Sequence, residues 1–262
     1  MTSSLPVSDV VLVDVAERVA VVTLHRPQAR NALNRQLRAA IPEVLGQLEE
    51  DDQVDVVVLT GADPAFCAGI DLKELGTDDQ AQQELAVVGG GGPFPPMSKP
   101  VIGAINGVAI TGGFELALAC DFLVASERAR FADTHSRVGI MPGWGLTVLL
   151  PQAVGVRRAK EMSTTGNFVD AKTALTWGLV NHVVPHDELL PVARQLAADI
   201  LTNDQAGVRR MLQTYDEGSR LTGAEAWQLE GRVSREWLAG GLDPAEMEAR
   251  RQRVVARGRA QL

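Results

Sequence analysis

Two glycine turns beside a carboxylate are the parts of this chain best suited to chemistry. The first turn spans residues 65–73 around Gly69, and the second spans residues 106–115 around Gly112. In each turn the glycine lies where a strand-like run gives way to a helical pattern, and a helix start leaves backbone N–H groups without partners. Two such starts that face each other would form an oxyanion hole for a polarised carbonyl, where each donor is worth roughly 10²–10³ in rate.

Glu115 lies three residues after Gly112, in the helix expected to follow the second turn, among the apolar residues Phe114, Leu116, Ala117 and Leu118. Burying a carboxylate is costly unless the group is paired or used. Two interpretations stay open on these grounds. Glu115 either moves a proton near the polarised carbonyl or only complements the positive end of the helix dipole.

Several other kinds of chemistry lack their residues. The chain has no P-loop, no dinucleotide-binding glycine fingerprint and no G-x-S-x-G nucleophile elbow. Its two cysteines, Cys67 and Cys120, stand in apolar stretches and suggest buried small side chains rather than a disulfide framework or a four-cysteine zinc site. Pro185 separates His182 from the nearby His186, which argues against a helical pair of metal ligands. We therefore expect no metal.

Composition narrows the class of partner. The chain has 262 residues, of which 45% are hydrophobic and 22% are charged, as in a soluble globular protein. With 25 Lys and Arg against 33 Asp and Glu the formal net charge is −8, so a nucleic-acid or membrane partner, which would need a basic face, is not expected. No apolar run approaches the ~18 residues of a membrane span, and the N-terminus shows no secretory signal. These features predict a cytoplasmic protein that acts on a small molecule.

The elements that must position the turns alternate between strand and helix. Apolar, β-branched runs predict strands over residues 10–15, 18–24, 54–59, 101–105 and 121–125. Amphipathic runs predict helices over residues 34–51, from 71 onward and over 114–120. Pro42 should kink or split the first of these helices. This alternation indicates an α/β fold.

The second half of the chain has a different character. Beyond residue 156 the pattern is mostly helical apart from a strand at 179–184, and two helices at 225–238 and 244–259 close the chain. We expect a core domain of residues 1–200 and a C-terminal helical region of residues 201–262. A Gly- and Pro-rich stretch at 76–96 predicts a surface loop.

The two turns and one further segment resemble a known family. The segments AFCAGIDLKEL (65–75) and INGVAITGGFELALACD (105–121), with the stretch 26–34, are similar to those of the crotonase, or enoyl-CoA hydratase/isomerase, superfamily. The resemblance implies a spiral of ββα units, a C-terminal trimerisation region and a homotrimer or homohexamer. It also implies an acyl-CoA thioester as the ligand, in fatty-acid degradation. Coenzyme A would enter as part of the substrate, with no separate cofactor.

The resemblance also assigns roles around the turns. The backbone N–H groups of Ile70 and Gly112 would hold the thioester oxygen. The residues that would border coenzyme A are Ala29, Ala32, Ala68, Ile70, Asp71, Leu72 and Lys73. Lys73 would contact a phosphate of coenzyme A or remain a solvated lysine. Trp144 would wall the acyl pocket or serve only in packing.

One position departs from the family pattern. Hydratases of this family use two glutamates to split one water across a double bond, and Glu115 matches the first. The second glutamate is expected 20 residues later, where this chain has His135. His135 could replace it as an acid/base, Asp133 could reach in instead, or the chemistry could differ from hydration; a buried structural histidine is the remaining interpretation. The main expectation is an enoyl-CoA hydratase, and the alternatives are an isomerase or a non-catalytic acyl-CoA carrier.

Overall fold

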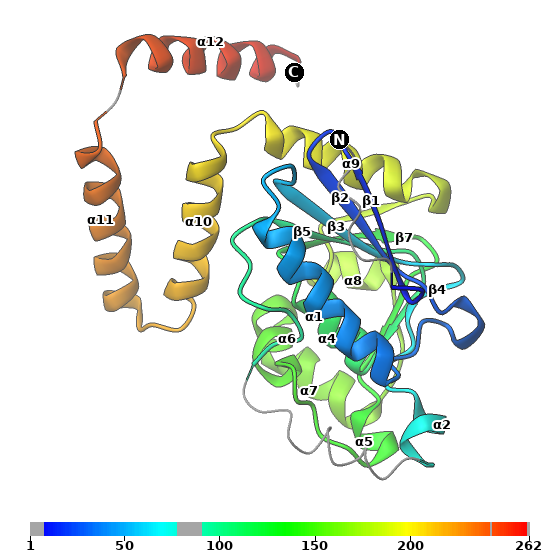
Figure 1. Cartoon of the computed structure of the whole chain (residues 1–262). Helices are drawn as coiled ribbons and strands as arrows, with labels where there is room; N and C mark the ends of the chain where they lie inside the picture. Colours follow the sequence, from blue (N-terminus) through cyan, green and yellow to red (C-terminus); the bar gives the residue numbers. More distant parts are fainter. Residues whose placement is uncertain (1–7, 78–90, 242, 261–262) are drawn as a thin grey trace. The chain divides into compact units, whose positions relative to one another are not determined.

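Pairs of strands followed by a helix recur along the first part of the chain. The computed structural model of the protein describes residues 8–77, 91–241 and 243–260. The repeated units, seen in Figure 1, comprise β1 (Val11–Ala16), β2 (Val19–Leu24) and α1 (Arg35–Glu50); β3 (Val56–Gly61), β4 (Ala65–Cys67) and α2 (Leu72–Leu75); β5 (Val101–Ile105), β6 (Val108–Ile110) and α4 (Gly112–Leu118); β7 (Phe122–Ser126), β8 (Arg130–Ala132) and α5 (His135–Val138).

The strands of these units build two sheets. The larger sheet has the order β1-β2-β3-β5-β7-β10, with β10 at His182–Val184, and the smaller has the order β4-β6-β8-β9, with β9 at Val169–Asp170. From the second unit onward, the first strand of each unit joins the larger sheet and the second joins the smaller one. Strands β2 to β10 of the larger sheet pair in parallel. Successive units therefore advance side by side, and the predicted α/β spiral of ββα units is confirmed.

The apolar runs of the strands follow from burial on both faces of the larger sheet. Val57 and Leu59 of β3 pack in the cluster that contains the buried side of α1. Val56 and Val58, which point the other way, pack with residues of α9 (Leu189–Leu201). In Figure 1, α1 lies in front of this sheet. A strand covered on both sides needs apolar residues at every position, which explains the unbroken run that predicted it.

The first long helix corrects one expectation. Asn34 caps α1, because its Oδ1 accepts the Leu37 N–H at 3.0 Å. Pro42 lies within α1, but the helix runs without a break from Arg35 to Glu50, so the predicted split is wrong. Proline removes one backbone hydrogen bond; the buried face of the helix offsets that loss, and its apolar members are Leu37, Ala40, Ile41, Val44, Leu45 and Leu48.

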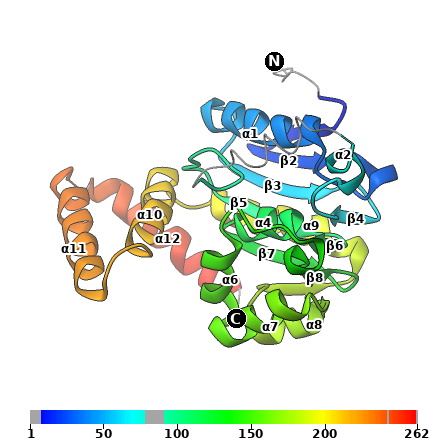
Figure 2. The same cartoon turned by 90° about the horizontal axis from the view of Figure 1, so that it is seen from below.

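The remaining helices of the core were predicted only as a mostly helical region. They are α6 (Leu146–Val154), α7 (Val156–Thr165), α8 (Ala171–Trp177) and α9. Figure 2 shows α7 and α8 below β8, with α6 beside α7. Cys67 and Cys120 are both buried free thiols, as their apolar surroundings predicted. Of the loop predicted at 76–96, residues 78–90 lie outside the described part of the chain.

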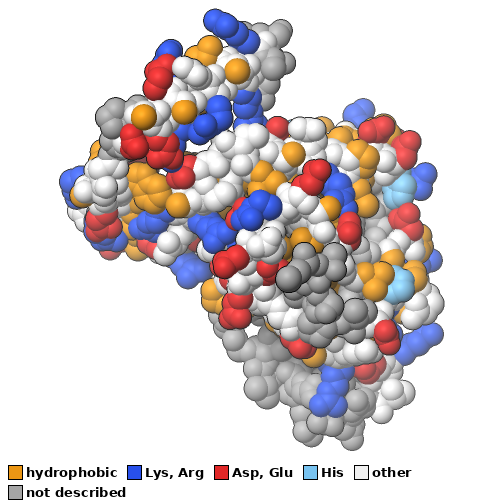
Figure 3. Space-filling view, turned by 45° about the horizontal axis from the view of Figure 1, so that its top comes forward, with side chains coloured by type: hydrophobic (Ala, Val, Ile, Leu, Met, Phe, Trp, Pro, Cys, Tyr) orange, Lys and Arg blue, Asp and Glu red, His pale blue; other side chains and the backbone are white. Residues whose placement is uncertain are grey.

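The chain divides into two compact units, residues 1–209 and residues 210–262. The division falls inside α10 (Gln205–Gly218), and the second unit continues with α11 (Gly223–Ala239) and α12 (Pro244–Ala260), which confirms the two predicted closing helices. Thr222 and Glu225 form a capping box that begins α11. Figure 3 shows apolar, basic and acidic side chains interspersed over the C-terminal helices. Across the described ranges, no helix combines the length and apolar character that crossing a membrane requires.

Candidate active site

The two glycine turns meet backbone to backbone. Gly69 has φ +87°, and a Cβ at this position would lie 2.7 Å from the Ile110 carbonyl oxygen and 3.2 Å from Thr111 Cβ. Glycine is required here, because a side chain would both strain the backbone and collide with the second turn. The turn before α2 is thereby held against the turn that begins α4.

This contact brings together the two predicted oxyanion donors. The Leu33 N–H donates to the Gly69 oxygen at 2.8 Å and the Leu33 oxygen accepts from the Asp71 N–H at 3.2 Å, an arrangement that leaves the Ile70 N–H directed away from Leu33. A Cβ at Gly112 would lie 3.7 Å from Ile70 Cδ1 and 3.8 Å from the Trp144 ring. Within the described ranges, neither the Ile70 N–H nor the Gly112 N–H has an acceptor. Two unused backbone donors therefore lie on adjacent turns beside Trp144.

Glu115 lies one turn further along α4 and is only 3% exposed. Its Oε1 accepts the backbone N–H groups of Trp144 at 2.8 Å and Leu146 at 3.4 Å. Its Oε2 lies 3.6 Å from His135 Nε2. The carboxylate thus has one oxygen held by the backbone at the start of α6 and the other facing an imidazole.

His135 lies between two carboxylates. It is 4% exposed, and its Nδ1 lies 2.7 Å from Oδ1 of Asp133, which is 1% exposed. The same oxygen also accepts the His135 backbone N–H at 3.1 Å. Asp133 therefore binds the opposite side of the ring from Glu115, and the three side chains follow the order Asp133, His135, Glu115.

The charges of this group set its protonation. Burial lowers the pKa of His135, but the hydrogen bonds and charges of Asp133 and Glu115 outweigh burial and raise the pKa to about 9. Burial raises the pKa of Asp133, and the hydrogen bonds from His135 and Ser163 outweigh this and lower it. At neutral pH the ring is therefore an imidazolium held by two carboxylates.

The residues predicted to border coenzyme A come from two segments that the fold joins. The Ala68 N–H donates to the Arg30 oxygen at 3.0 Å, so the segment of Ala29 and Ala32 lies along the segment of Ala68. The guanidinium of Arg26 donates to the Ala32 carbonyl and, at 3.1 Å, to Asp71. These contacts of Arg26 were not predicted, although Arg26 belongs to a segment that carried the family resemblance.

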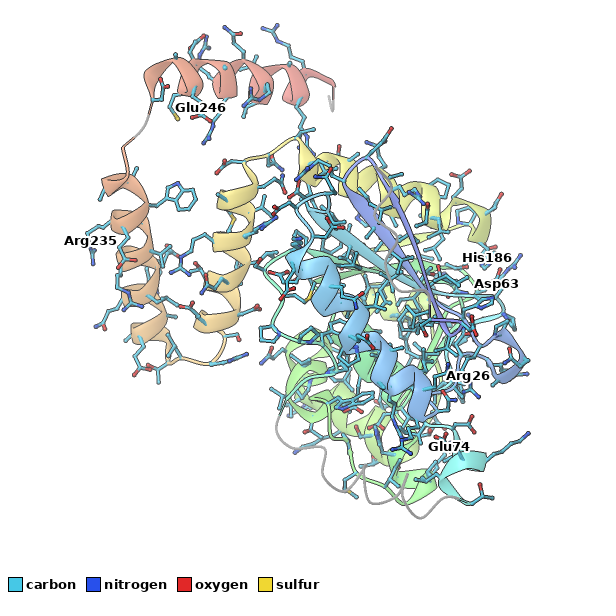
Figure 4. The ribbon with its side chains drawn as sticks, viewed as in Figure 1. Arg26, Asp63, Glu74, His186, Arg235 and Glu246 are labelled. Atoms are coloured by element: carbon cyan, nitrogen blue, oxygen red, sulfur yellow. The ribbon has the colours of Figure 1, made fainter. Side chains whose placement is uncertain are left out.

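The residues predicted to border coenzyme A at the start of α2 differ in how far they are already engaged. Asp71 caps α2 by accepting the Lys73 N–H at 3.2 Å, so its carboxylate serves the cap and the Arg26 ion pair. Leu72 and Lys73 are exposed. Figure 4 labels Arg26 and Glu74 at this end of α1. Lys73 is therefore the member of this segment whose charged side chain is open to a ligand.

Some features of the site left no trace in the sequence pattern. The donors to Glu115 are backbone N–H groups some 30 residues further along the chain. Because every residue type except proline has this group, the sequence does not show which residues will donate. His186 lies outside this site, where its ring forms a 3.0 Å hydrogen bond with Asp63 (Figure 4). The ring also bonds to the Ser126 hydroxyl at 3.1 Å. In the portion of the chain that the structure describes, no cluster of His, Cys, Asp and Glu is arranged to hold a metal ion.

Comparison with known proteins finds relatives that match most of the chain. A relative from Arabidopsis thaliana named "Probable enoyl-CoA hydratase 1, peroxisomal" is 39% identical over 233 residues, which cover 85% of this chain and 84% of the relative. The crystal structure of an enoyl-CoA hydratase from Mycobacterium smegmatis matches with a TM-score of 0.74 and 51% identity, covering 89% of this chain and 100% of the other.

A monofunctional enoyl CoA isomerase from M. smegmatis also matches, with a TM-score of 0.70, 34% identity and coverage of 84% of this chain and 98% of its own. The sequence model of the family described as enoyl-CoA hydratase/isomerase matches residues 14–240. Because that match spans most of the chain and relatives above 30% identity cover it, the chain belongs to the enoyl-CoA hydratase/isomerase family, within the crotonase superfamily.

Proposed function

We propose that the protein is an enoyl-CoA hydratase, a hydro-lyase that adds water across the 2,3 double bond of a 2-enoyl-CoA in fatty-acid degradation. The observation that carries the proposal is the 3.6 Å approach of Glu115 Oε2 to His135 Nε2. It supplies two proton-transfer groups beside two unused backbone donors, which is what syn addition of water to a conjugated thioester requires.

Addition of water requires two proton transfers, one to Glu115 and one from His135. The thioester oxygen accepts the N–H groups of Ile70 and Gly112, Glu115 takes a proton from water, and the water oxygen bonds to C3. The electrons of the double bond move to the thioester oxygen as an enolate, and C2 then takes a proton from His135 Nε2. Transfer of the proton from Glu115 to the neutral imidazole restores the starting state. The thioester is the electron sink, so coenzyme A enters as part of the substrate.

The charge of the site supports His135 in the place of a second glutamate. Two glutamates that share one proton carry a single negative charge. An imidazolium between the carboxylates of Asp133 and Glu115 gives the same net charge. The raised pKa of His135, caused by these two carboxylates against the opposing effect of burial, keeps the ring charged at neutral pH. His135 is therefore poised as the acid and Glu115 as the base.

The bound substrate is proposed to lie along the joined segments described above. Coenzyme A would border Ala29, Ala32, Ala68 and the residues from Ile70 to Lys73, with the exposed Lys73 available to a phosphate group. The acyl group would extend toward the ring of Trp144, which lies beside Gly112. We also propose that the chain assembles as a homotrimer or homohexamer through its C-terminal helices.

A second candidate is double-bond isomerisation, for which Glu115 alone could carry a proton between two carbons. Its support is the likeness to the M. smegmatis isomerase. A carrier that binds acyl-CoA without turnover is the third possibility. Incubation with crotonyl-CoA and, separately, with a 3-enoyl-CoA, followed by the change in enoyl absorbance and identification of the product, separates them. Formation of 3-hydroxybutyryl-CoA supports the hydratase, turnover of a 3-enoyl-CoA alone supports the isomerase, and binding without turnover supports the carrier.

A further inference from the structure

Thr111 has an unusual backbone for its residue type. Its φ is 55° and its ψ is −117°, and the residue is 4% exposed. The other non-glycine residues with positive φ in the described ranges are Glu17, Arg18, Arg30 and Asn31. None of these has the branched Cβ that makes such a conformation costly for threonine. A strained residue of this kind persists only when its surroundings hold it, and such residues cluster at functional sites.

The surroundings of Thr111 hold each of its polar groups. Its N–H donates to the Ala132 oxygen at 3.0 Å, and its carbonyl oxygen accepts the N–H groups of Phe114 and Glu115 at 2.9 Å each. Its hydroxyl forms a 2.6 Å hydrogen bond with the hydroxyl of Thr134. Thr111 is thus tied both to its own helix α4 and to the segment that follows β8.

These ties join the two halves of the candidate site. The ψ angle of Thr111 sets the plane of the peptide that carries the Gly112 N–H, so the strained conformation decides where that donor points. Thr134 directly precedes His135 in the chain. The bond between the two hydroxyls therefore connects the oxyanion donor with the proton donor through side chains that touch neither water nor thioester in the proposed mechanism.

We propose that Thr111 is a positioning residue. Its hydroxyl bond to Thr134 fixes the position of the Gly112 N–H relative to the His135 ring. The proposal rests on the proposed function, since it takes Gly112 and His135 as the groups that need alignment. The hydroxyl, rather than the volume of the side chain, is the element that transmits the alignment.

The variants follow from this distinction. Thr111→Val keeps the branched shape and removes the hydroxyl, Thr111→Ser keeps the hydroxyl, and Thr134→Val removes the same bond from a residue with negative φ. Thr60→Val is the matched control, because Thr60 is also 4% exposed and its hydroxyl donates to the Ala104 oxygen at 2.8 Å, outside the site.

With crotonyl-CoA, we expect Thr111→Val and Thr134→Val each to lower kcat about tenfold with KM changed less than about twofold. Thr111→Ser should restore kcat, the double valine variant should be no worse than either single one, and Thr60→Val should lower only the melting temperature. Independent losses in the double variant, or normal kcat in folded Thr111→Val, would overturn the proposal.

The pH at which His135 titrates is a second measurement, and it does not depend on turnover. The imidazole resonance of His135, identified by its loss in a His135→Gln variant, should titrate at a different pH in Thr111→Val and Thr134→Val but not in Thr60→Val. If the wild type does not hydrate crotonyl-CoA while this resonance moves as expected, the proposed function fails and the alignment stands. If the wild type hydrates crotonyl-CoA and the resonance is the same in all variants, the alignment fails and the function stands.

Discussion

The backbone N–H of Trp144 donates to Glu115 Oε1 at 2.8 Å, which turns the other oxygen of the carboxylate toward His135. The backbone at the start of α6 therefore orients the carboxylate of Glu115, the proposed base. An uncharged side chain with an oxygen in the same place could accept the same hydrogen bond. A change that keeps the shape of Glu115 should leave the site assembled and remove only its chemistry.

Glu115→Gln should lower turnover by roughly 10²–10⁴ and leave the affinity for acyl-CoA nearly unchanged. The amide oxygen of glutamine can still accept the Trp144 N–H, whereas the amide nitrogen cannot take a proton from water. Steady-state rates with crotonyl-CoA and calorimetric binding of a saturated acyl-CoA measure the two effects. Full activity in the glutamine variant would refute the mechanism, whatever His135 does.

The pH dependence of the rate should report His135. The two carboxylates outweigh burial and raise the pKa of His135 to about 9. Because the imidazolium donates the proton, kcat/KM should be retained below this pKa and lost as the pH rises through about 9. Asp133→Asn removes one of these negative charges and should move the basic limb at least one pH unit lower. A pH–rate profile with an unmoved basic limb in Asp133→Asn would show that another group is the acid.

Stability should depend on the same group. The hydrogen bonds and charges of Asp133 and Glu115 outweigh burial and raise the pKa of His135 in the folded protein to about 9, above the ordinary histidine value of 6.5. The charged ring therefore stabilises the folded state fully below pH 6.5, and this stabilisation is lost as the pH rises through 9. The difference in pKa corresponds to about 3 kcal/mol. Urea unfolding at pH values on either side of this window should show the loss in the wild type and a smaller loss in His135→Gln.

Three glycine substitutions should distinguish effects on turnover from effects on folding. A Cβ at Gly112 would lie 3.0 Å from Leu33 Cδ1, a flexible group, so Gly112→Ala should fold and lose turnover through displacement of its N–H donor. A Cβ at Gly113 would lie 2.2 Å from the Cys67 carbonyl oxygen, so Gly113→Ala should fail to fold.

Gly46 in α1 has nothing within 4 Å of its Cβ position, so Gly46→Ala should be active and more stable by about 0.5–1 kcal/mol. Circular dichroism melting and crotonyl-CoA turnover test all three variants. A stable Gly113→Ala, or a fully active Gly112→Ala, would contradict the placement of the two turns.

Assembly should depend on the C-terminal helices. Trp227, Trp237 and Leu238 of α11 are 76%, 43% and 55% exposed, and monomeric proteins rarely leave large apolar side chains grouped at their surface. Light scattering at micromolar concentration should give a mass three or six times the chain mass of 28.0 kDa, and Trp227→Glu should reduce it. A wild-type mass of 28.0 kDa would refute the assembly.

Much of the fold could be predicted because its rules act over a few neighbouring residues. The run Val56–Leu59 is apolar throughout, since both faces of β3 are covered, and Asn34 and Asp71 begin their helices by accepting nearby N–H groups. The second sheet was not predicted, because β4, β6 and β8 have 3 residues each and are too short to show a period. The split predicted at Pro42 does not occur, because the buried face of the helix, which a local proline rule does not count, outweighs the lost hydrogen bond.

Residue types and their spacing are enough to point to the candidate residues: two glycine turns, Glu115, and a histidine where the family resemblance implies a glutamate. The contacts that orient these residues are visible only in the folded chain. Asp133 binds His135 Nδ1, the Trp144 backbone holds Glu115, and Thr111 meets Thr134. The two longer-range pairings join chain segments some 20 to 30 residues apart, and even the short step from Asp133 to His135 depends on side-chain direction. Such contacts depend on sheet order and backbone angles, and these bring together residues that no local pattern of residue types links.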